Sequence, residues 1–147
     1  MKCPFCREND TEVYNTRSTR FQTQIWRRRR CLNCQQSFTT YEQPDLNFLK
    51  VLPATGRPRR YSRAKLFSSI YAAFLDIKAK DGTIDAVTDT VEAKILDTKK
   101  DALSAPEIAA IVLTTLKHFN TSAFLRYLST HAELASSAQL KKELKKY

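Results

Sequence analysis

Two pairs of cysteines, each spaced C-x-x-C, constrain what the first part of this chain can fold into. The pairs are Cys3 with Cys6 and Cys31 with Cys34, and they account for all four cysteines of the 147 residues. Four thiolates at this spacing can hold one Zn²⁺ tetrahedrally, and the metal then substitutes for a hydrophobic core that so short a segment cannot build. Because the protein would fill all four coordination positions, we expect a structural zinc site and not a catalytic one.

The same cysteines could instead be redox-active or disulfide-bonded pairs. Disulfide frameworks are typical of small secreted chains, and the amino terminus here lacks the apolar stretch of a secretory signal. No run of about 18 apolar residues is present, so we also expect no membrane span. The sequence therefore favours zinc and a cytoplasmic protein.

Neither cysteine pair is followed by glycine. Arg7 follows the first pair and Gln35 follows the second. Turns of this kind often need a positive φ, which glycine adopts without steric cost. We therefore expect slight backbone strain at both positions.

Four consecutive arginines, Arg27–Arg30, lead directly into the second cysteine pair. Residues 1–63 carry 13 Lys and Arg against 5 Asp and Glu, a net charge of +8, whereas residues 64–147 carry 12 against 10, a net charge of +2. A rigid arginine-rich surface suits phosphate, so we expect nucleic acid as the partner, with Arg17 and Arg20 extending the basic surface. In a strand, alternate guanidinium groups project to opposite faces, so two of the four would follow one phosphate path.

Two other interpretations of this charge stay open. A run of charges is most often a solvated face. An anionic membrane would also attract it, although this part of the sequence holds no amphipathic basic helix. Arginine can read guanine edges as well as bind phosphate, and the sequence does not separate these two contacts.

The chain is expected to be an α+β protein of two domains. Residues 1–44 are polar and β-prone, with alternation at Glu12–Tyr14 and Phe21–Trp26 and another short strand at Phe38–Tyr41, which indicates a small antiparallel zinc ribbon. Residues 45–50 are expected to form a linker that runs into the first strand of the second domain.

Residues 49–134 are expected to form a mainly helical domain that begins with a β-hairpin turning at Gly56. Apolar residues at helical spacing predict four helices. The first is capped by Ser62, the third begins with a capping box from Ser104 to Glu107, and the fourth begins at Asn120 or Thr121. The residues that follow this spacing are Leu66, Ile70, Phe74 and Ile77, then Ile84, Val87, Val91 and Ile95, then Ile108, Ile111, Val112 and Leu116, and finally Phe124, Tyr127, Leu128 and His131. Residues 135–147 are expected to form a basic helical tail.

The hairpin carries enough positive charge to suggest a phosphate site. Arg57, Arg59 and Arg60 flank the turn, and Lys65 follows early in the first helix. From the residues alone, a basic hairpin is more often a solvated turn. The sequence shows no Walker loop and no nucleophile paired with a base, so we expect no enzyme, and a bound nucleotide would not be hydrolysed.

With these motifs considered together, the chain resembles the NrdR family, the bacterial transcriptional repressors of ribonucleotide reductase genes. The resembling motifs are both cysteine pairs, Thr16-Arg17, the Arg27–Arg30 run, Phe38–Glu42, Gly56-Arg57, Lys65 and Ala123–Tyr127, and the resemblance spans residues 1–131. It implies a zinc ribbon that binds paired operator boxes and an ATP-cone domain in which ATP or dATP sets the oligomeric state. The nucleotide-binding residues that it implies are Val51, Leu52, Gly56, Arg57, Lys65, Tyr127 and His131.

The hairpin departs from the family pattern. The family's two basic residues that meet the phosphates are replaced here by Pro53 and Ala54, whereas Lys65 is kept. Each lost charge-assisted contact costs about 1.5–3 kcal/mol, so the hypothesis is weaker or altered nucleotide binding unless Arg57, Arg59 or Arg60 compensates.

Two rival functions follow from the same residues. In one, the ribbon docks on a protein such as RNA polymerase and the cone no longer binds nucleotide. In the other, the chain is an accessory domain of an enzyme.

Overall fold

The computed structural model describes residues 1–18, 23–53, 55–131 and 137–147, and it divides the chain into two compact units, Met1–Asp45 and Leu46–Tyr147. The first unit is a small antiparallel sheet with a cysteine cluster, and the second combines helices with a short sheet. The predicted α+β class is therefore confirmed. Arg20 and Ala54 lie outside the described residues.

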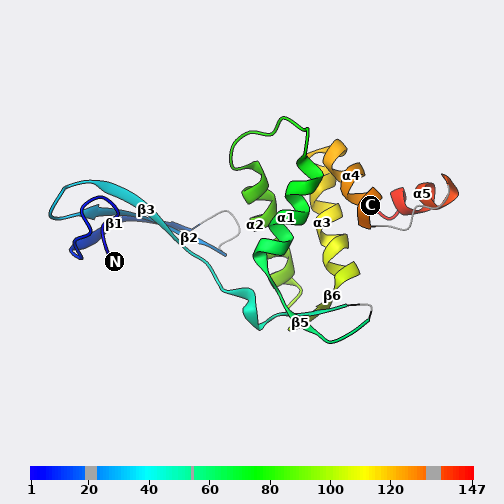
Figure 1. The fold of residues 1–147 in the computed structure, drawn as a ribbon, viewed down its shortest axis with the longest axis horizontal. Helices are drawn as coiled ribbons and strands as arrows, with labels where there is room; N and C mark the ends of the chain where they lie inside the picture. The colour runs from blue at the N-terminus through cyan, green and yellow to red at the C-terminus, as the bar shows by residue number, and fades with distance from the viewer. Residues whose placement is uncertain (19–22, 54, 132–136) are drawn as a thin grey trace. The chain divides into compact units, whose positions relative to one another are not determined.

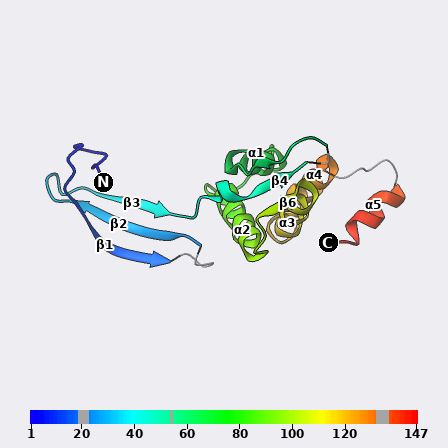
Figure 2. The same ribbon diagram turned by 90° about the horizontal axis from the view of Figure 1, so that it is seen from below.

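Three strands form the sheet of the first unit: β1 (Thr11–Ser18), β2 (Ile25–Cys31) and β3 (Ser37–Glu42). Strand β2 lies in the centre and pairs antiparallel with both neighbours, as Figure 2 shows. All four arginines of the run belong to β2, which begins at Ile25. Phe21 and Gln22, at the start of the predicted second strand, lie outside the described residues.

The second unit begins with a 3₁₀ turn, η1 (Leu46–Phe48), followed by the hairpin strands β4 (Lys50–Leu52) and β5 (Arg59–Arg60). A further strand, β6 (Ala102–Ser104), pairs parallel with β4, so the sheet order is β5-β4-β6. The sequence does not predict β6, because three residues are too few to show alternation. The strand lies directly before the capping box, which signals only the start of α3.

Five helices follow the hairpin in the described part of the chain. Their bounds are α1 (Arg63–Phe74), α2 (Thr83–Asp97), α3 (Ala105–Phe119), α4 (Thr121–His131) and α5 (Ser137–Leu144). Helix α2 lies beside both α1 and α3, α4 packs against α1 and α3 in turn, and β5 and β6 lie at one end of the helices (Figure 1). No helix among the described residues is both long and apolar enough to cross a bilayer.

The helix boundaries agree with local sequence signals in all but two places. The capping box is confirmed, because Ser104 and Glu107 exchange both expected hydrogen bonds. Ser62 stands at the N-cap of α1, but its side chain makes no capping hydrogen bond. Helix α1 ends at Phe74 and not at Ile77, since Asp76 takes a left-handed conformation with φ of 65° that helical residues do not adopt. Ile77 still packs against the core.

The hydrophobic core lies within the second unit. Its fully buried residues come from every predicted apolar stripe and include Ile70, Val87, Val91, Val112, Leu116 and Leu128. Leu103 of β6 is also buried, which attaches the small sheet to the helices. Tyr147 packs edge-on against Phe124 with ring centroids 6.0 Å apart, so the basic tail contacts the core at its end.

Candidate functional sites

The four cysteines come together in the first unit. Their Sγ atoms all lie within 4.8 Å of one another, with Cys3 Sγ 3.6 Å from Cys34 Sγ and Cys6 Sγ 3.5 Å from Cys31 Sγ. Tetrahedral Zn–S bonds of about 2.3 Å would separate the sulfurs by about 3.8 Å, so the donor set fits Zn²⁺.

Two turns of the same form hold these ligands. In the first, the Arg7 amide donates to the Cys3 carbonyl at 2.9 Å, and in the second the Gln35 amide donates to the Cys31 carbonyl at 3.0 Å. Arg7 has a φ of 66° and Gln35 a φ of 60°, which confirms the positive φ expected where glycine is absent. Each turn therefore holds a side-chain-bearing residue in the left-handed region, at a cost of about 1 kcal/mol.

The environment of the cluster favours thiolate at one position. A hydrogen bond with the Glu8 backbone is the main cause that lowers the pKa of the Cys6 thiol to about 7. In the same cluster a hydrogen bond with the Gln36 backbone lowers the pKa of the Cys34 thiol, but burial and the neighbouring thiols outweigh it and raise that pKa, so the sulfurs titrate together. Ionised Cys is the form that binds metal. The chemistry of the site is structural, because four protein ligands leave Zn²⁺ no open position.

The arginines of β2 divide between the two faces of the sheet. Arg28 pairs with Asn15 and Thr39, and Arg27 pairs with Thr16 and Thr40. Because side chains alternate along a strand, Arg28 and Arg30 share one face and Arg27 and Arg29 share the other. The predicted alternation of the run is confirmed.

The face that carries Arg28 also carries aromatic residues, and we call it the aromatic face. Its members are Tyr14, Arg17, Trp26, Arg28, Arg30 and Tyr41, and Glu12, the strand partner of Arg30, shares the face. The guanidinium of Arg17 lies 5.8 Å from the centroid of the Trp26 ring, a cation–π distance. Arg28 Nε donates to the Tyr14 hydroxyl at 3.2 Å, which fixes the direction of its guanidinium. Tyr41 opposite Trp26 is 61% exposed.

The opposite face is partly neutralised. Arg27 forms an ion pair with Glu42 at 2.8 Å, and its Nε is buried without a partner among the described residues. Arg29 Nε donates to Thr40 Oγ1 at 3.2 Å. The aromatic face thus offers the larger free positive charge. Arg20, predicted to extend the basic surface, lies outside the described residues.

A cavity of about 370 Å³ opens in the second unit between the hairpin, the start of α1, the start of α3 and the end of α4. Four of the predicted nucleotide residues, Val51, Lys65, Tyr127 and His131, line it. Leu52, Gly56 and Arg57 are not among its lining residues. Its walls also include Pro53, Arg59, Arg60, Ser62 and Ser69.

One wall of this cavity is aromatic. The rings of Tyr127 and His131 stack with centroids 3.8 Å apart and planes inclined by 5°. His131 Nδ1 also lies 3.0 Å from the Tyr127 carbonyl oxygen, so the imidazole is held in place. Burial raises the pKa of the Tyr127 hydroxyl. A flat wall of this kind suits a purine or ribose, and its apolar surface complements the cations on the hairpin side.

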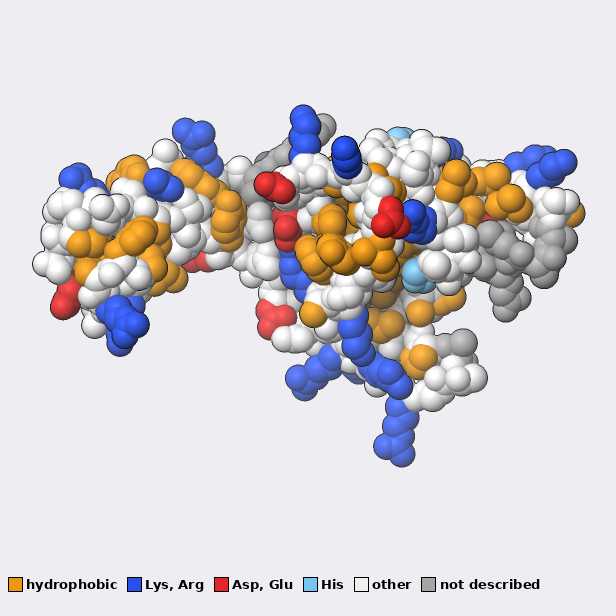
Figure 3. All heavy atoms as spheres, turned by 45° about the horizontal axis from the view of Figure 1, so that its top comes forward, with side chains coloured by type: hydrophobic (Ala, Val, Ile, Leu, Met, Phe, Trp, Pro, Cys, Tyr) orange, Lys and Arg blue, Asp and Glu red, His pale blue; other side chains and the backbone are white. Residues whose placement is uncertain are grey.

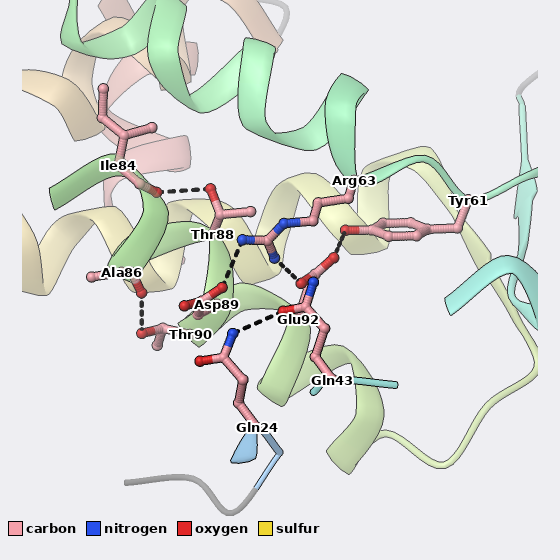
Figure 4. Close-up of polar contacts among 10 residues, drawn as sticks. All are labelled: Gln24, Gln43, Tyr61, Arg63, Ile84, Ala86, Thr88, Asp89, Thr90 and Glu92. Atoms are coloured by element: carbon pink, nitrogen blue, oxygen red, sulfur yellow. Dashed lines mark hydrogen bonds and ion pairs between the residues drawn. The ribbon is translucent and has the colours of Figure 1, made fainter. Parts of the chain in front are cut away.

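A polar network holds the junction between β5 and α1, where several cavity residues originate (Figure 4). The Tyr61 hydroxyl donates to Glu92 Oε1 at 2.9 Å, Arg63 donates to Glu92 Oε2, and Arg63 Nη2 donates to Asp89 Oδ1 at 2.7 Å. Glu92 is only 7% exposed, and burial together with this carboxylate raises the pKa of Tyr61. The network fixes the start of α1, and with it Ser62 and Lys65, against α2.

Sequence analysis missed this network. Glu92 directly follows Val91 in the apolar stripe of α2, and periodicity treats such a residue as a solvated neighbour. A buried carboxylate requires hydrogen-bonding partners, and only the folded structure shows that Tyr61 and Arg63 supply them.

Comparisons with known proteins agree with this division into two units. Residues 1–42 match the family model described as the N-terminal domain of transcriptional repressor NrdR-like proteins, and residues 49–136 match the ATP cone domain. The chain is 34% identical over 131 residues to a transcriptional repressor NrdR from Albidiferax ferrireducens, covering 89% of this chain and 88% of that protein. Proteins of the same name are 32% identical in Polynucleobacter necessarius, over 99% of this chain and all of the relative, and 28% identical in Finegoldia magna, over 99% and 97%.

Proposed function

Because the chain belongs to the NrdR family of transcriptional repressors, a family of regulators and not of enzymes, we propose that it represses ribonucleotide reductase genes in response to nucleotide. It binds operator boxes upstream of those genes through residues 1–44. ATP or dATP binds in the cone, residues 49–134, and controls the oligomeric state and thereby the affinity for DNA. The observation that carries the proposal is that one chain holds both a cationic sheet face beside a zinc site and a cavity with cationic and aromatic walls.

Zinc held by the four cysteines stabilises the ribbon, and the basic residues Arg17, Arg20 and Arg27–Arg30 meet double-stranded DNA. Within this set, the aromatic face is the better candidate for direct contact. Among the described residues its arginines form no ion pair with a carboxylate, whereas Arg27 on the other face is paired with Glu42. Phosphate contacts from this face position the ribbon on the duplex, and an arginine that reaches a guanine edge adds sequence preference.

In the cone, the adenine nucleotide occupies the cavity between the hairpin and α4. Lys65 lies on the hairpin side and supports the phosphates, and the Tyr127–His131 stack supports the base or sugar. A nucleotide shifts assembly only through its different affinity for the two assemblies, so ATP and dATP must bind them unequally. Regulation of bacterial genes by this route takes place in the cytoplasm.

Light scattering combined with DNA-binding titrations tests this function. The zinc-loaded protein is studied without nucleotide, with ATP and with dATP. The probe is a duplex from upstream of the ribonucleotide reductase genes of the same genome, compared with a shuffled duplex. We expect the molar mass to differ between nucleotide states and the operator affinity to follow it. Equal mass and equal affinity in all three states would contradict nucleotide control.

Face-specific variants provide the matched control for DNA binding. Arg30→Gln on the aromatic face should weaken binding and lower the slope of log K against log salt by about 1, because one phosphate contact is lost. Arg27→Gln, on the paired face, should change the slope less. If both variants bind the operator duplex as tightly as the unmodified protein does, and the shuffled duplex binds as tightly as the operator duplex, the ribbon is not the DNA-binding unit. The rival function, docking on RNA polymerase with a cone that binds no nucleotide, would then be favoured.

A further inference from the structure

The hairpin side of the cone cavity has an unusual distribution of charge. The turn contributes Pro53, an uncharged residue, whereas three cations border the cavity: Arg59, Arg60 and Lys65. None of the three forms an ion pair with a carboxylate among the residues that the structure describes. Figure 3 shows Lys and Arg side chains standing out from the end of the unit that carries this hairpin. A polyphosphate in the cavity would therefore meet its positive charge on β5 and α1, not on the turn.

Two other arginines near the junction do not qualify as phosphate ligands. Arg57 is close in sequence but does not line the cavity. Arg63 is directed to Asp89 and Glu92, so its charge is already neutralised by two carboxylates. A phosphate would have to compete with both carboxylates for the Arg63 guanidinium.

Strand register distinguishes the remaining two arginines. Arg59 pairs with Val51, and Val51 pairs on its other side with Leu103, which is 1% exposed. Residues opposite one another share a face, so Arg59 stands on the face of the sheet that turns toward the core and the cavity. Arg60 pairs with Lys50, an exposed residue, and therefore belongs to the other face of the sheet, although Arg60 also borders the cavity. Tyr61, the next residue on the Arg59 face, is buried, which agrees with this assignment.

We propose that Arg59 is the residue that binds the nucleotide phosphates, together with Lys65, in place of the basic residues that the turn lacks. This assignment rests on the proposed binding of ATP or dATP in the cone. The guanidinium offers two parallel N–H donors to a phosphate, which the Lys65 ammonium on α1 complements from the side. The Tyr61–Glu92 hydrogen bond anchors the strand one residue beyond Arg60 and so keeps the face assignment of Arg59 fixed.

Isothermal titration with ATP and with adenosine tests the assignment. For Arg59→Gln we expect about 10- to 100-fold weaker ATP binding and an adenosine affinity within threefold of the unmodified protein, because only a charge-assisted phosphate contact is lost. Lys50→Gln is the control, since it removes a positive charge from the opposite face of the same sheet, and Lys50 does not line the cavity. Its ATP affinity should stay within threefold. Both positions are exposed, and circular dichroism verifies that the fold is retained.

A rescue variant makes the test sharper. Adding Pro53→Lys to Arg59→Gln returns a cation to the cavity wall and should recover most of the ATP affinity. If Arg59→Gln binds ATP as the unmodified protein does, or if Lys50→Gln loses as much affinity, the assignment of Arg59 is wrong although nucleotide binding stands. If the unmodified protein binds neither ATP nor dATP, the proposed function of the cone fails, and this assignment fails with it.

Discussion

At the scale of single residues, the zinc turns show how metal binding tolerates poor local geometry. Arg7 and Gln35 hold positive φ angles that glycine would adopt more easily, yet both turns form the same backbone hydrogen bonds. Zinc affinity is coupled to folding, so the metal can offset a cost of about 1 kcal/mol per turn. The strain is therefore measurable only by changing the residue while the metal stays bound.

Arg7→Gly should raise the stability of the zinc-loaded ribbon by about 0.5–1 kcal/mol relative to Arg7→Ala, because both variants remove the same guanidinium and only glycine relieves the left-handed backbone. Urea unfolding followed by the fluorescence of Trp26 measures the difference. Trp26 is the chain's single tryptophan and lies in β2, so the signal reports on the ribbon alone. Equal unfolding midpoints for the two variants would contradict the predicted strain.

At the scale of elements, the sequence predicts helices that show apolar periodicity and capping residues. It does not predict features that depend on a single contact between residues far apart in the sequence. The stripes through Val87, Val91 and Leu116 and the capping box at Ser104 all appear as predicted. The metal ligands were predictable because their chemistry requires a fixed spacing. In contrast, β6 is too short to show a pattern, and the partners of Glu92 lie 31 and 29 residues away in sequence. Four of the seven predicted nucleotide residues line the cavity, whereas the side-chain faces in a two-residue strand such as β5 follow from strand pairing and not from local sequence.

Glu92→Gln should destabilise the cone by about 2–3 kcal/mol, because the loss of the carboxylate charge leaves Arg63 without its buried ion-pair partner. Thermal unfolding followed by circular dichroism at 222 nm measures the effect. Asp89→Asn is the control at the exposed end of the same network, where side-chain exposure is 36% against 10% for Glu92, and it should cost less than about 1 kcal/mol. Equal losses would show that burial does not govern the energetics of this network.

At the scale of the whole molecule, the two units are stabilised by different means. The hydrophobic core cluster is drawn wholly from residues of Leu46–Tyr147, whereas the four metal ligands all belong to Met1–Asp45. A segment of about 45 residues buries too little apolar surface to fold without a metal or disulfide. The ribbon therefore depends on zinc, and the cone does not.

Removal of zinc with a chelator should consequently separate the two proposed activities. Structural Zn²⁺ contributes about 10–16 kcal/mol of apparent binding energy in small zinc modules, more than a ribbon of this size retains without it. We expect the Trp26 emission to shift to the red and operator binding to fall to the level of shuffled DNA. ATP affinity, measured by titration on the same sample, should stay within threefold, and most of the helical circular dichroism signal should persist. Readdition of zinc under reducing conditions serves as the control, because it should restore DNA binding. Operator binding that survives chelation would contradict the role of the cysteine cluster, and a parallel loss of ATP binding would contradict the independence of the cone.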